Sequence, residues 1–295
     1  MYALVSRASD PTPAVEEVES PVLGPADVRV HVAAAGFTLF DAFVAGDHAT
    51  LGLPDVIGLG FDFSGTVLEM GPDVTGLKPG DLVAGMHADP AAPSRAHASE
   101  VVVPADAVAP VPDGLALEEA ASVVLSALAA RQALDLLGPE RGRLLVTGAA
   151  GSVGGWAVAL AKRAGWAVDA LVRPGSEEIA RSAGASTVLT ELPGPTYDAV
   201  LDAAALQEAA IAAVRDAGRF VGTKPGRDVP AERGIAVSAV LTRPDGASLG
   251  ELLPLAATGE APVRIAARRP LAEAAKAYAE ATAAPGSAGR WLLVP

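Results

Sequence analysis

Hydrophobic and polar positions alternate with a period of two in the first hundred residues. Val28, Val30 and Val32 alternate with Arg29 and His31, a pattern typical of a half-buried strand whose histidine faces solvent. Further strand-like runs, separated by turns rich in glycine and proline, lie at 61–67, 82–84 and 100–104. Closely spaced strands of this kind predict a small β-barrel or sandwich.

The pattern changes near Pro112, where helical and strand-like segments begin to alternate. A long helix is expected over 117–137, closed by Gly138 and Pro139. Strands are then expected at 143–147, 167–172, 187–189, 198–202 and 219–222, and helices at 152–164, 177–182 and 207–214. This series predicts an α/β fold with a doubly wound parallel sheet. Near the end, a helix is expected over 271–283 and a strand over 290–294.

Composition narrows the class of protein. The 295 residues, 51% of them hydrophobic and 19% charged, are enough for two domains with buried cores. A formal net charge of −13 disfavours binding to nucleic acid or to an anionic membrane. The absence of cysteine excludes a disulfide scaffold, a thiolate metal site and a cysteine nucleophile. The first residues lack a signal-peptide pattern, so a cytoplasmic protein is expected.

The segment 144–154, LLVTGAAGSVG, carries the strongest chemical signal. It contains a variant of the dinucleotide-binding pattern, with Ala149, Gly151 and Gly154 at the small-residue positions. Gly151 would let the backbone approach a pyrophosphate at a helix start, and Gly154 would let the helix pack on its strand. Such turns also occur for packing alone, but the strand before it and the helix after it favour a nucleotide site. The candidate cofactor residues here are Thr147, Ala149, Ala150, Gly151, Ser152, Val153 and Gly154.

Arg173 follows the second strand of this unit, about twenty residues after the glycine-rich turn. A site for NADH is expected to place a carboxylate there to bind the ribose hydroxyls. Arg173 instead offers a charge suited to the 2′-phosphate of NADPH, with Ser176 as a hydroxyl donor. The alternative is an ordinary solvated loop arginine. The presence of Arg173 where a site for NADH would have a carboxylate favours NADPH as the cofactor.

Taken in order, these segments resemble the zinc-independent medium-chain dehydrogenases/reductases of the quinone oxidoreductase (zeta-crystallin-like) type. The resemblance is carried by the segments 34–41, 60–67, 78–83, 147–154, 218–221 and 289–294. It implies a GroES-like β-barrel domain formed by 1–112 and 259–295, and a Rossmann domain over 113–258. It also implies an active site in the cleft between the domains, cofactor contacts from Ser126, Val221 and Gly222, and a homodimer, in which the edge strand near 236–241 would pair across a two-fold axis.

The chain departs from the family at several positions. Zinc-dependent relatives need a cysteine near position 38 and a histidine after Gly60, whereas this chain has Thr38 and Phe61, so no catalytic zinc is expected. Thr38 is a candidate hydroxyl donor to a developing oxyanion; the alternative is a turn hydroxyl bonded to its own backbone. Asp41 would position this loop or the cofactor ribose. The replacements at Ala129 and Arg131 are expected to alter substrate choice.

The resemblance implies hydride transfer from NADPH to a small-molecule carbonyl compound of the quinone, enone or enoyl type. The proton would come from water, because an enolate is protonated readily without a dedicated acid. His48 either borders the substrate cleft or is simply solvated. The alternative function is a non-catalytic NADPH-binding sensor or regulatory protein on the same scaffold, since fold alone does not decide function.

Overall fold

The computed structural model describes residues 1–224, 229–283 and 289–295, which form two compact units. Unit 1 comprises Met1–Leu125, Arg243–Ala257 and Val263–Pro295, and unit 2 comprises Ser126–Thr242 and Thr258–Pro262. The expected boundary at Pro112 precedes helix α3 (Leu117–Leu136), whereas the units divide within that helix. Helix α7 (Gly246–Ala257), expected in the Rossmann domain, belongs to unit 1 because it packs on strand β8 (Val108–Pro110).

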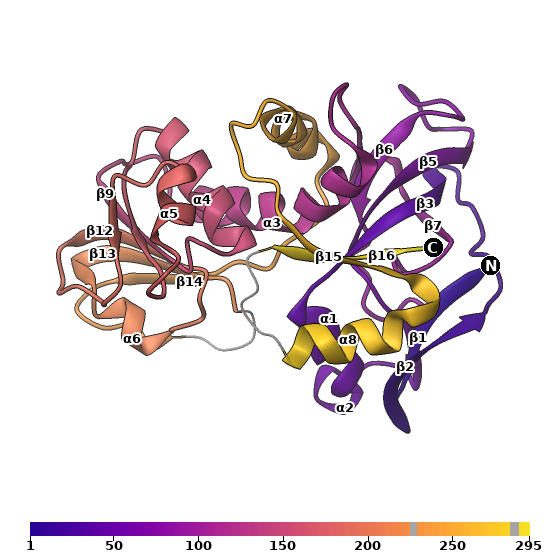
Figure 1. The fold of residues 1–295 in the computed structure, drawn as a ribbon, viewed down its shortest axis with the longest axis horizontal. Coiled ribbons are helices and arrows are strands. Elements are labelled where there is room, and N and C mark those ends of the chain that lie inside the picture. Colours follow the sequence, from indigo (N-terminus) through magenta and orange to yellow (C-terminus); the bar gives the residue numbers. More distant parts are fainter. Residues whose placement is uncertain (225–228, 284–288) are drawn as a thin grey trace. The chain divides into compact units, whose positions relative to one another are not determined.

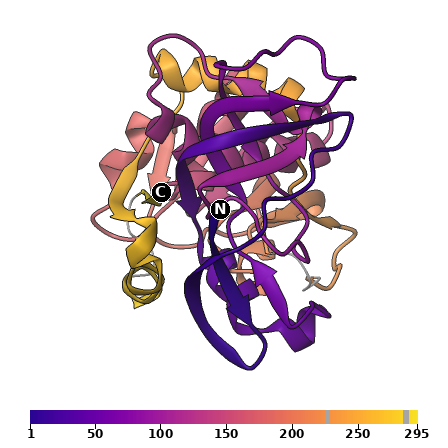
Figure 2. The ribbon, with the colours of Figure 1, turned by 90° about the vertical axis from the view of Figure 1, so that its right-hand side faces the viewer.

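Unit 1 is built mainly from antiparallel strands. A three-stranded sheet has the order β2-β1-β4, and a larger sheet has the order β15-β16-β3-β5-β6-β8, with β7 also paired to β3. Their bounds are β1 (Tyr2–Arg7), β2 (Asp10–Glu17), β3 (Asp27–Phe37), β4 (Val56–Gly58), β5 (Asp62–Met70), β6 (Leu82–Met86), β7 (Glu100–Pro104), β15 (Ile265–Pro270) and β16 (Arg290–Val294). Because β16 pairs with β3, both ends of the chain contribute to one sheet. Figure 2 looks onto this unit.

The core of unit 1 follows the predicted period of two. Val28, Val30 and Val32 of β3 are buried, while His31 between them is exposed. Short helices add to the strands: α1 (Leu39–Gly46), α2 (His48–Leu51) and α8 (Ala274–Ala283), with 3₁₀ turns at Ala105–Ala107 and Leu271–Glu273. Helix α8 lies beside α1 (Figure 1).

Unit 2 contains a six-stranded parallel sheet with the order β11-β10-β9-β12-β13-β14. Its strands are β9 (Arg143–Thr147), β10 (Ala167–Leu171), β11 (Thr187–Leu189), β12 (Tyr197–Asp202), β13 (Val214–Gly222) and β14 (Ala236–Ala239). Helices α4 (Ser152–Arg163) and α5 (Glu177–Ser182) lie on one face and α6 (Glu208–Ile211) on the other (Figure 1). The prediction of a doubly wound parallel sheet is confirmed, and its central strands are apolar because both faces are covered.

Two predicted helices differ in extent. The helix expected over 207–214 is limited to α6, because Gln207 has φ 56° and β13 already begins at Val214. The helix expected over 271–283 begins with a 3₁₀ turn after Pro270 and becomes α-helical only at Ala274. Within the described ranges, no helix has both the length and the apolar character needed to cross a bilayer.

Candidate functional site

The glycine-rich turn joins β9 to α4 in unit 2. Gly148 has φ +63°, and a Cβ at this position would lie 3.1 Å from the backbone of Ala203 and Ala204. A Cβ on Gly154 would lie 2.2 Å from the Gly148 carbonyl oxygen, so no side chain fits there. Gly151 is the N-cap residue of α4, and no side chain caps this helix end. The first amides of α4 therefore present positive dipoles to an anion.

Asp202 fixes the loop that faces this turn across the carboxyl edge of the sheet. The carboxylate is buried and accepts hydrogen bonds from the Thr147 hydroxyl at 2.5 Å and from the backbone N–H of Gln207 at 2.7 Å. Ala204 N–H also donates to the Thr147 hydroxyl at 3.1 Å. Strands β9 and β12 are neighbours from opposite halves of the sheet, so the loop and the turn meet at its topological switch point. Open α/β sheets bind their ligands there.

Arg173 and Ser176 follow the carboxyl end of β10, the strand on the other side of β9. The Ser176 N–H donates to the Arg173 carbonyl at 3.1 Å, with Gly175 at φ +88° between them. This turn presents Arg173 as an exposed side chain and leaves Ser176 half-buried at the start of α5. Both residues lie at the same edge as the glycine-rich turn, as the sequence predicts.

The remaining predicted cofactor residues lie in two further places in unit 2. Ser126 on α3 is 1% exposed, and its hydroxyl is buried without a hydrogen-bond partner. Val221 and Gly222 end strand β13. An orphaned buried hydroxyl, an uncapped helix start and a turn that excludes side chains all fit a bound dinucleotide. The residues present therefore fit a nicotinamide dinucleotide.

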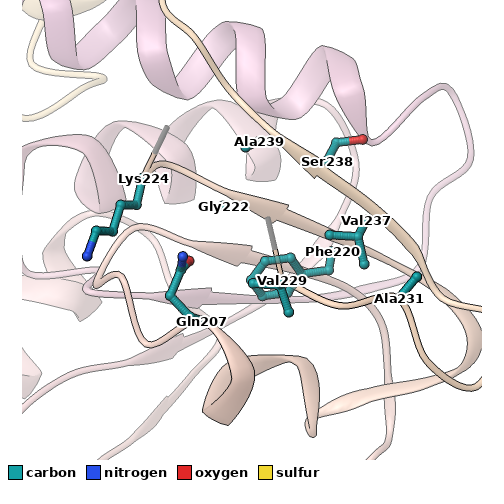
Figure 3. Close-up of a pocket in the computed structure, with 9 residues that line it drawn as sticks. All are labelled: Gln207, Phe220, Gly222, Lys224, Val229, Ala231, Val237, Ser238 and Ala239. Carbon is teal, nitrogen blue, oxygen red and sulfur yellow. The ribbon is translucent and has the colours of Figure 1, made fainter. Parts of the chain in front are cut away.

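A pocket of about 290 Å³ lies beside the carboxyl ends of β13 and β14. Figure 3 shows Phe220, Val229 and Val237 forming its apolar wall, and the polar groups of Gln207 and Lys224 at one end. Gly222 also lines it. Lys224 and Gln207 were not singled out from the sequence, because neither lies in a recognisable motif.

Thr38 and Asp41 form a reciprocal cap at the start of α1 in unit 1. The Thr38 hydroxyl and backbone N–H donate to the same Asp41 carboxylate oxygen, at 2.6 and 2.8 Å, and the Asp41 N–H donates to the Thr38 hydroxyl at 3.1 Å. This is a capping box, with aspartate in the place of the usual glutamate. The single hydroxyl proton of Thr38 is thus directed at Asp41. The other carboxylate oxygen of Asp41 is buried without a partner.

A second buried carboxylate lies below this cap. Asp62 at the start of β5 is fully buried, and it accepts hydrogen bonds from the Arg290 guanidinium and from the Leu125 N–H. Burial raises the pKa of Asp62 to about 6, against the charge of Arg290. A Cβ on Gly36 would lie 2.6 Å from the Asp62 carboxylate, so glycine is required there. Asp62 and Arg290 are 228 residues apart in sequence, and neither lies in a motif that predicts the pair.

The segment between β6 and β7 adds a buried histidine and a buried arginine. His97 donates from Nε2 to the Gly36 carbonyl at 2.9 Å, and its Nδ1 lies 2.8 Å from the Tyr278 hydroxyl oxygen. Desolvation lowers the pKa of His97. The guanidinium of Arg95 lies 4.4 Å from the Phe61 ring centre. None of these contacts was predicted from the sequence.

His48 corrects one expectation. It is 4% exposed and bonds the Ser6 hydroxyl at 3.1 Å and the Pro54 carbonyl at 2.8 Å. It is therefore a buried residue held by unit 1 and is not solvated. The expectation of a solvated histidine was wrong because Ser6 is distant in sequence, and nothing local signals the contact.

Comparisons with known proteins agree with this architecture. Residues 24–113 match the family model of the alcohol dehydrogenase GroES-like domain. A quinone oxidoreductase of Pseudomonas aeruginosa is 29% identical in an alignment of 313 positions that covers 92% of each chain. The trans-enoyl reductase tazE of Aspergillus terreus is 28% identical over 64% of this chain and 68% of its own. The erythronolide synthase EryA2 of Saccharopolyspora erythraea is 37% identical over 185 residues, and the match spans only 5% of that protein.

Solved structures of oxidoreductases also share the architecture of this chain. A quinone oxidoreductase from Coxiella burnetii superposes with a TM-score of 0.88 at 24% identity, over 100% of this chain and 99% of that one. A thermostable alcohol dehydrogenase from Pyrobaculum aerophilum gives 0.85 at 26% identity, over 100% and 99%. The chain thus has the fold of the medium-chain dehydrogenases/reductases, and it is similar to their quinone oxidoreductases. This fold consists of a GroES-like domain and a Rossmann domain with a parallel sheet.

Proposed function

We propose that this chain is an NADPH-dependent reductase that transfers hydride to a quinone, an enone or an enoyl-type carbonyl compound without a metal ion. The observation that carries the proposal is the meeting of the glycine-rich turn with the loop held by Asp202 at the switch point of the parallel sheet. The relatives that share this fold include a quinone oxidoreductase and a trans-enoyl reductase, which supports the reaction class.

NADPH, when bound, supplies the hydride. The amides at the start of α4, among them those of Ser152 and Val153, would bind the pyrophosphate. Arg173 would pair with the 2′-phosphate and Ser176 would donate its hydroxyl. The Ser126 hydroxyl, buried without a partner, and the end of β13 would complete the site.

The proposal includes a metal-free reaction. The chain has no cysteine, and within the described part no three His, Asp or Glu side chains gather in a way that would hold a metal ion. Charge that develops on the substrate oxygen must therefore be met by hydrogen-bond donors of the protein.

Thr38 and Asp41 remain the proposed residues of the catalytic loop. Their proposed role is to position the start of α1, because the hydroxyl proton of Thr38 is already hydrogen-bonded to the Asp41 carboxylate. Donation by Thr38 to a substrate would require rotation of its side chain and loss of that hydrogen bond. Water would supply the proton that completes the reduction.

The remaining proposals concern the setting of the reaction. A small carbonyl compound is the proposed substrate, and the cytoplasm the proposed location. Strand β14 ends the parallel sheet, and an edge strand of this kind offers a pairing surface for a homodimer. The chain spans only 5% and 4% of the length of two polyketide synthases that it matches, EryA2 and PikAII.

The experiment that tests the function is NADPH consumption with a panel of quinones, enones and enoyl thioesters, recorded beside NADPH binding. Turnover of at least one class, with NADPH preferred to NADH, is expected. Tight binding of NADPH without turnover of any compound would instead support a non-catalytic NADPH-binding sensor or regulatory protein.

A further inference from the structure

The face of the parallel sheet that carries α6 is only partly covered by helix. Helix α6 has four residues and packs on β12 and β13. The described residues between β13 and β14 form no helix. The pocket of about 290 Å³ lies beside these two strands, and all of its described lining residues belong to unit 2. The described part of the pocket is therefore built by one unit alone.

The wall of this pocket is apolar. Phe220 on β13 is 1% exposed and Val229 is 5% exposed, and both belong to the hydrophobic cluster that also includes residues of α6. Val237 on β14 is half-buried and packs against the same cluster. Figure 3 shows these three side chains around the cavity. Such a wall binds a hydrocarbon group, because the group leaves water when it enters the pocket.

Lys224 is the one charged side chain among the described lining residues. Together with Gln207 it supplies the polar groups at one end of the pocket (Figure 3). The described lining residues include no aspartate and no glutamate, although the chain carries a formal net charge of −13. Lys224 is exposed, and no carboxylate of the described residues pairs with it. Within the described part of the chain, its positive charge is therefore available to an anion.

Asp202 at the end of β12 anchors both segments that form the polar end. The Gln207 N–H donates to the Asp202 carboxylate at 2.7 Å, and Gln207 has φ 56°, a conformation that favours glycine. Thr223, the residue before Lys224, donates to the Asp202 carbonyl from its N–H and from its hydroxyl, each at 3.1 Å. A site whose backbone is held before the ligand arrives loses little entropy on binding.

The volume limits the ligand to a small molecule. Ligand pockets typically enclose about 300–1,000 Å³, so a cavity of about 290 Å³ fits a single ring or a short branched chain. Phosphate groups are held by several cations or by a row of free amides, whereas one ammonium matches one carboxylate. The lining therefore fits a hydrocarbon body with a single carboxylate at one end.

We propose that this pocket is a binding site for a small apolar carboxylic acid, aromatic or branched aliphatic, in its ionised form. The hydrocarbon body lies between Phe220 and Val237, and the carboxylate accepts hydrogen bonds from Lys224. The site is separate from the proposed nucleotide site, because the glycine-rich turn follows β9, and β12 lies between β9 and β13. That turn leads into α4, on the face of the sheet opposite to α6 (Figure 1). The inference goes beyond the proposed reductase activity and does not depend on it.

The probe is 4-(trifluoromethyl)benzoate, whose fluorine NMR signal reports binding to the full chain without cofactor. At low ionic strength, wild type should bind it about 5- to 10-fold more tightly than Lys224→Met, and added salt should reduce the difference. Lys224→Arg keeps the charge and should retain most of the affinity. The uncharged 4-(trifluoromethyl)benzamide should bind wild type and Lys224→Met equally. The matched control Lys276→Met removes an exposed lysine of α8 and should bind the benzoate like wild type.

Val237→Phe should abolish binding of the benzoate, because the larger side chain fills the cavity. If that variant does not fold, a crystal structure of the wild type with the benzoate decides: the ring is expected against Phe220, and any other position contradicts the site. Equal affinities of wild type and Lys224→Met for the benzoate, or unchanged binding by folded Val237→Phe, would overturn the inference.

Competition with NADPH tests whether the two sites are separate, since Gly222 lines the pocket and is also a predicted cofactor residue. The benzoate should stay bound when NADPH is saturating. Its displacement by NADPH would show that the pocket belongs to the nucleotide site and would refute the inference. The measurement of benzoate binding needs neither cofactor nor turnover, so its failure leaves the proposed function untouched.

Discussion

The Thr38 hydroxyl donates to the Asp41 carboxylate at 2.6 Å, and the Asp41 N–H donates back to the same hydroxyl at 3.1 Å. This reciprocal pair fixes the entry into α1 and uses the one proton that Thr38 can donate. The residue in the expected place of a catalytic donor is therefore a helix cap, while the unsatisfied donors of unit 1 include the amino groups of Arg95.

Thr38→Ala should lower the free energy of unfolding by about 1 kcal/mol, because the N-cap interaction is lost. Thr38→Ser should restore most of it. We expect the kcat of Thr38→Ala to stay within a few-fold of the wild-type value. Urea unfolding measures the stability of each variant, and steady-state kinetics measures its kcat. A loss of about 100-fold in kcat without loss of stability would instead identify Thr38 as an oxyanion donor.

Arg173→Ala should weaken NADPH binding by about 10- to 100-fold, since a charged hydrogen bond to the 2′-phosphate contributes about 1.5–3 kcal/mol. NADH affinity should change little, because NADH has no phosphate there. Titration calorimetry with both nucleotides measures the difference. The control Arg181→Ala removes an exposed arginine of α5 paired with Glu178. Equal losses for NADPH and NADH in Arg173→Ala would contradict the phosphate assignment.

Gly154→Ala should destabilise unit 2 by about 1–3 kcal/mol, because the new methyl group would lie 2.2 Å from the Gly148 carbonyl oxygen. Gly250→Ala in α7 is the matched control, since nothing lies within 4 Å of a Cβ there. That control should be neutral or slightly stabilising, because alanine favours the helix more than glycine does. Urea unfolding compares the two variants; equal stabilities would contradict the packing.

His87 should make the protein less stable in acid. Burial, and next the charge of Arg95, lower the pKa of His87 from 6.5 to about 4. Between these pH values the unfolded chain binds a proton that the folded chain refuses, so the free energy of unfolding falls as pH falls from 6.5 toward 4, by at most about 3 kcal/mol.

His87→Gln should remove this acid-induced loss of stability. The free energy of unfolding of wild type and variant is measured with urea at pH 7 and at pH 4.5, and the two changes are compared. Asp62 acts in the opposite direction, because its raised pKa adds stability as pH falls from about 6. The comparison between variants cancels that contribution. Parallel pH profiles for the two proteins would show that His87 does not carry the effect.

The parallel sheet and the glycine-rich turn were predictable because their signals are local: alternation of apolar segments, and small residues between a strand and a helix. The buried polar contacts of unit 1 were not. Asp62 pairs with Arg290, which is 228 residues away in sequence, and His97 pairs with Tyr278, which is 181 residues away. Each of these residues is a single polar residue among apolar neighbours in sequence, and its partner comes close only in the folded chain. Arg95 follows an exposed, proline-containing turn, so its burial has no sequence signature.

The most direct test of the central claim uses NADPH that carries deuterium at C4 of the nicotinamide, with a crotonyl thioester and a quinone as substrates. With both C4 hydrogens replaced by deuterium, so that either face delivers the label, we expect a saturated thioester with one deuterium on the β-carbon. When the reaction runs in labelled water, the α-carbon should carry a solvent-derived hydrogen. Nucleotide that binds tightly while neither substrate is reduced, or a reduced thioester without deuterium at the β-carbon, would contradict it.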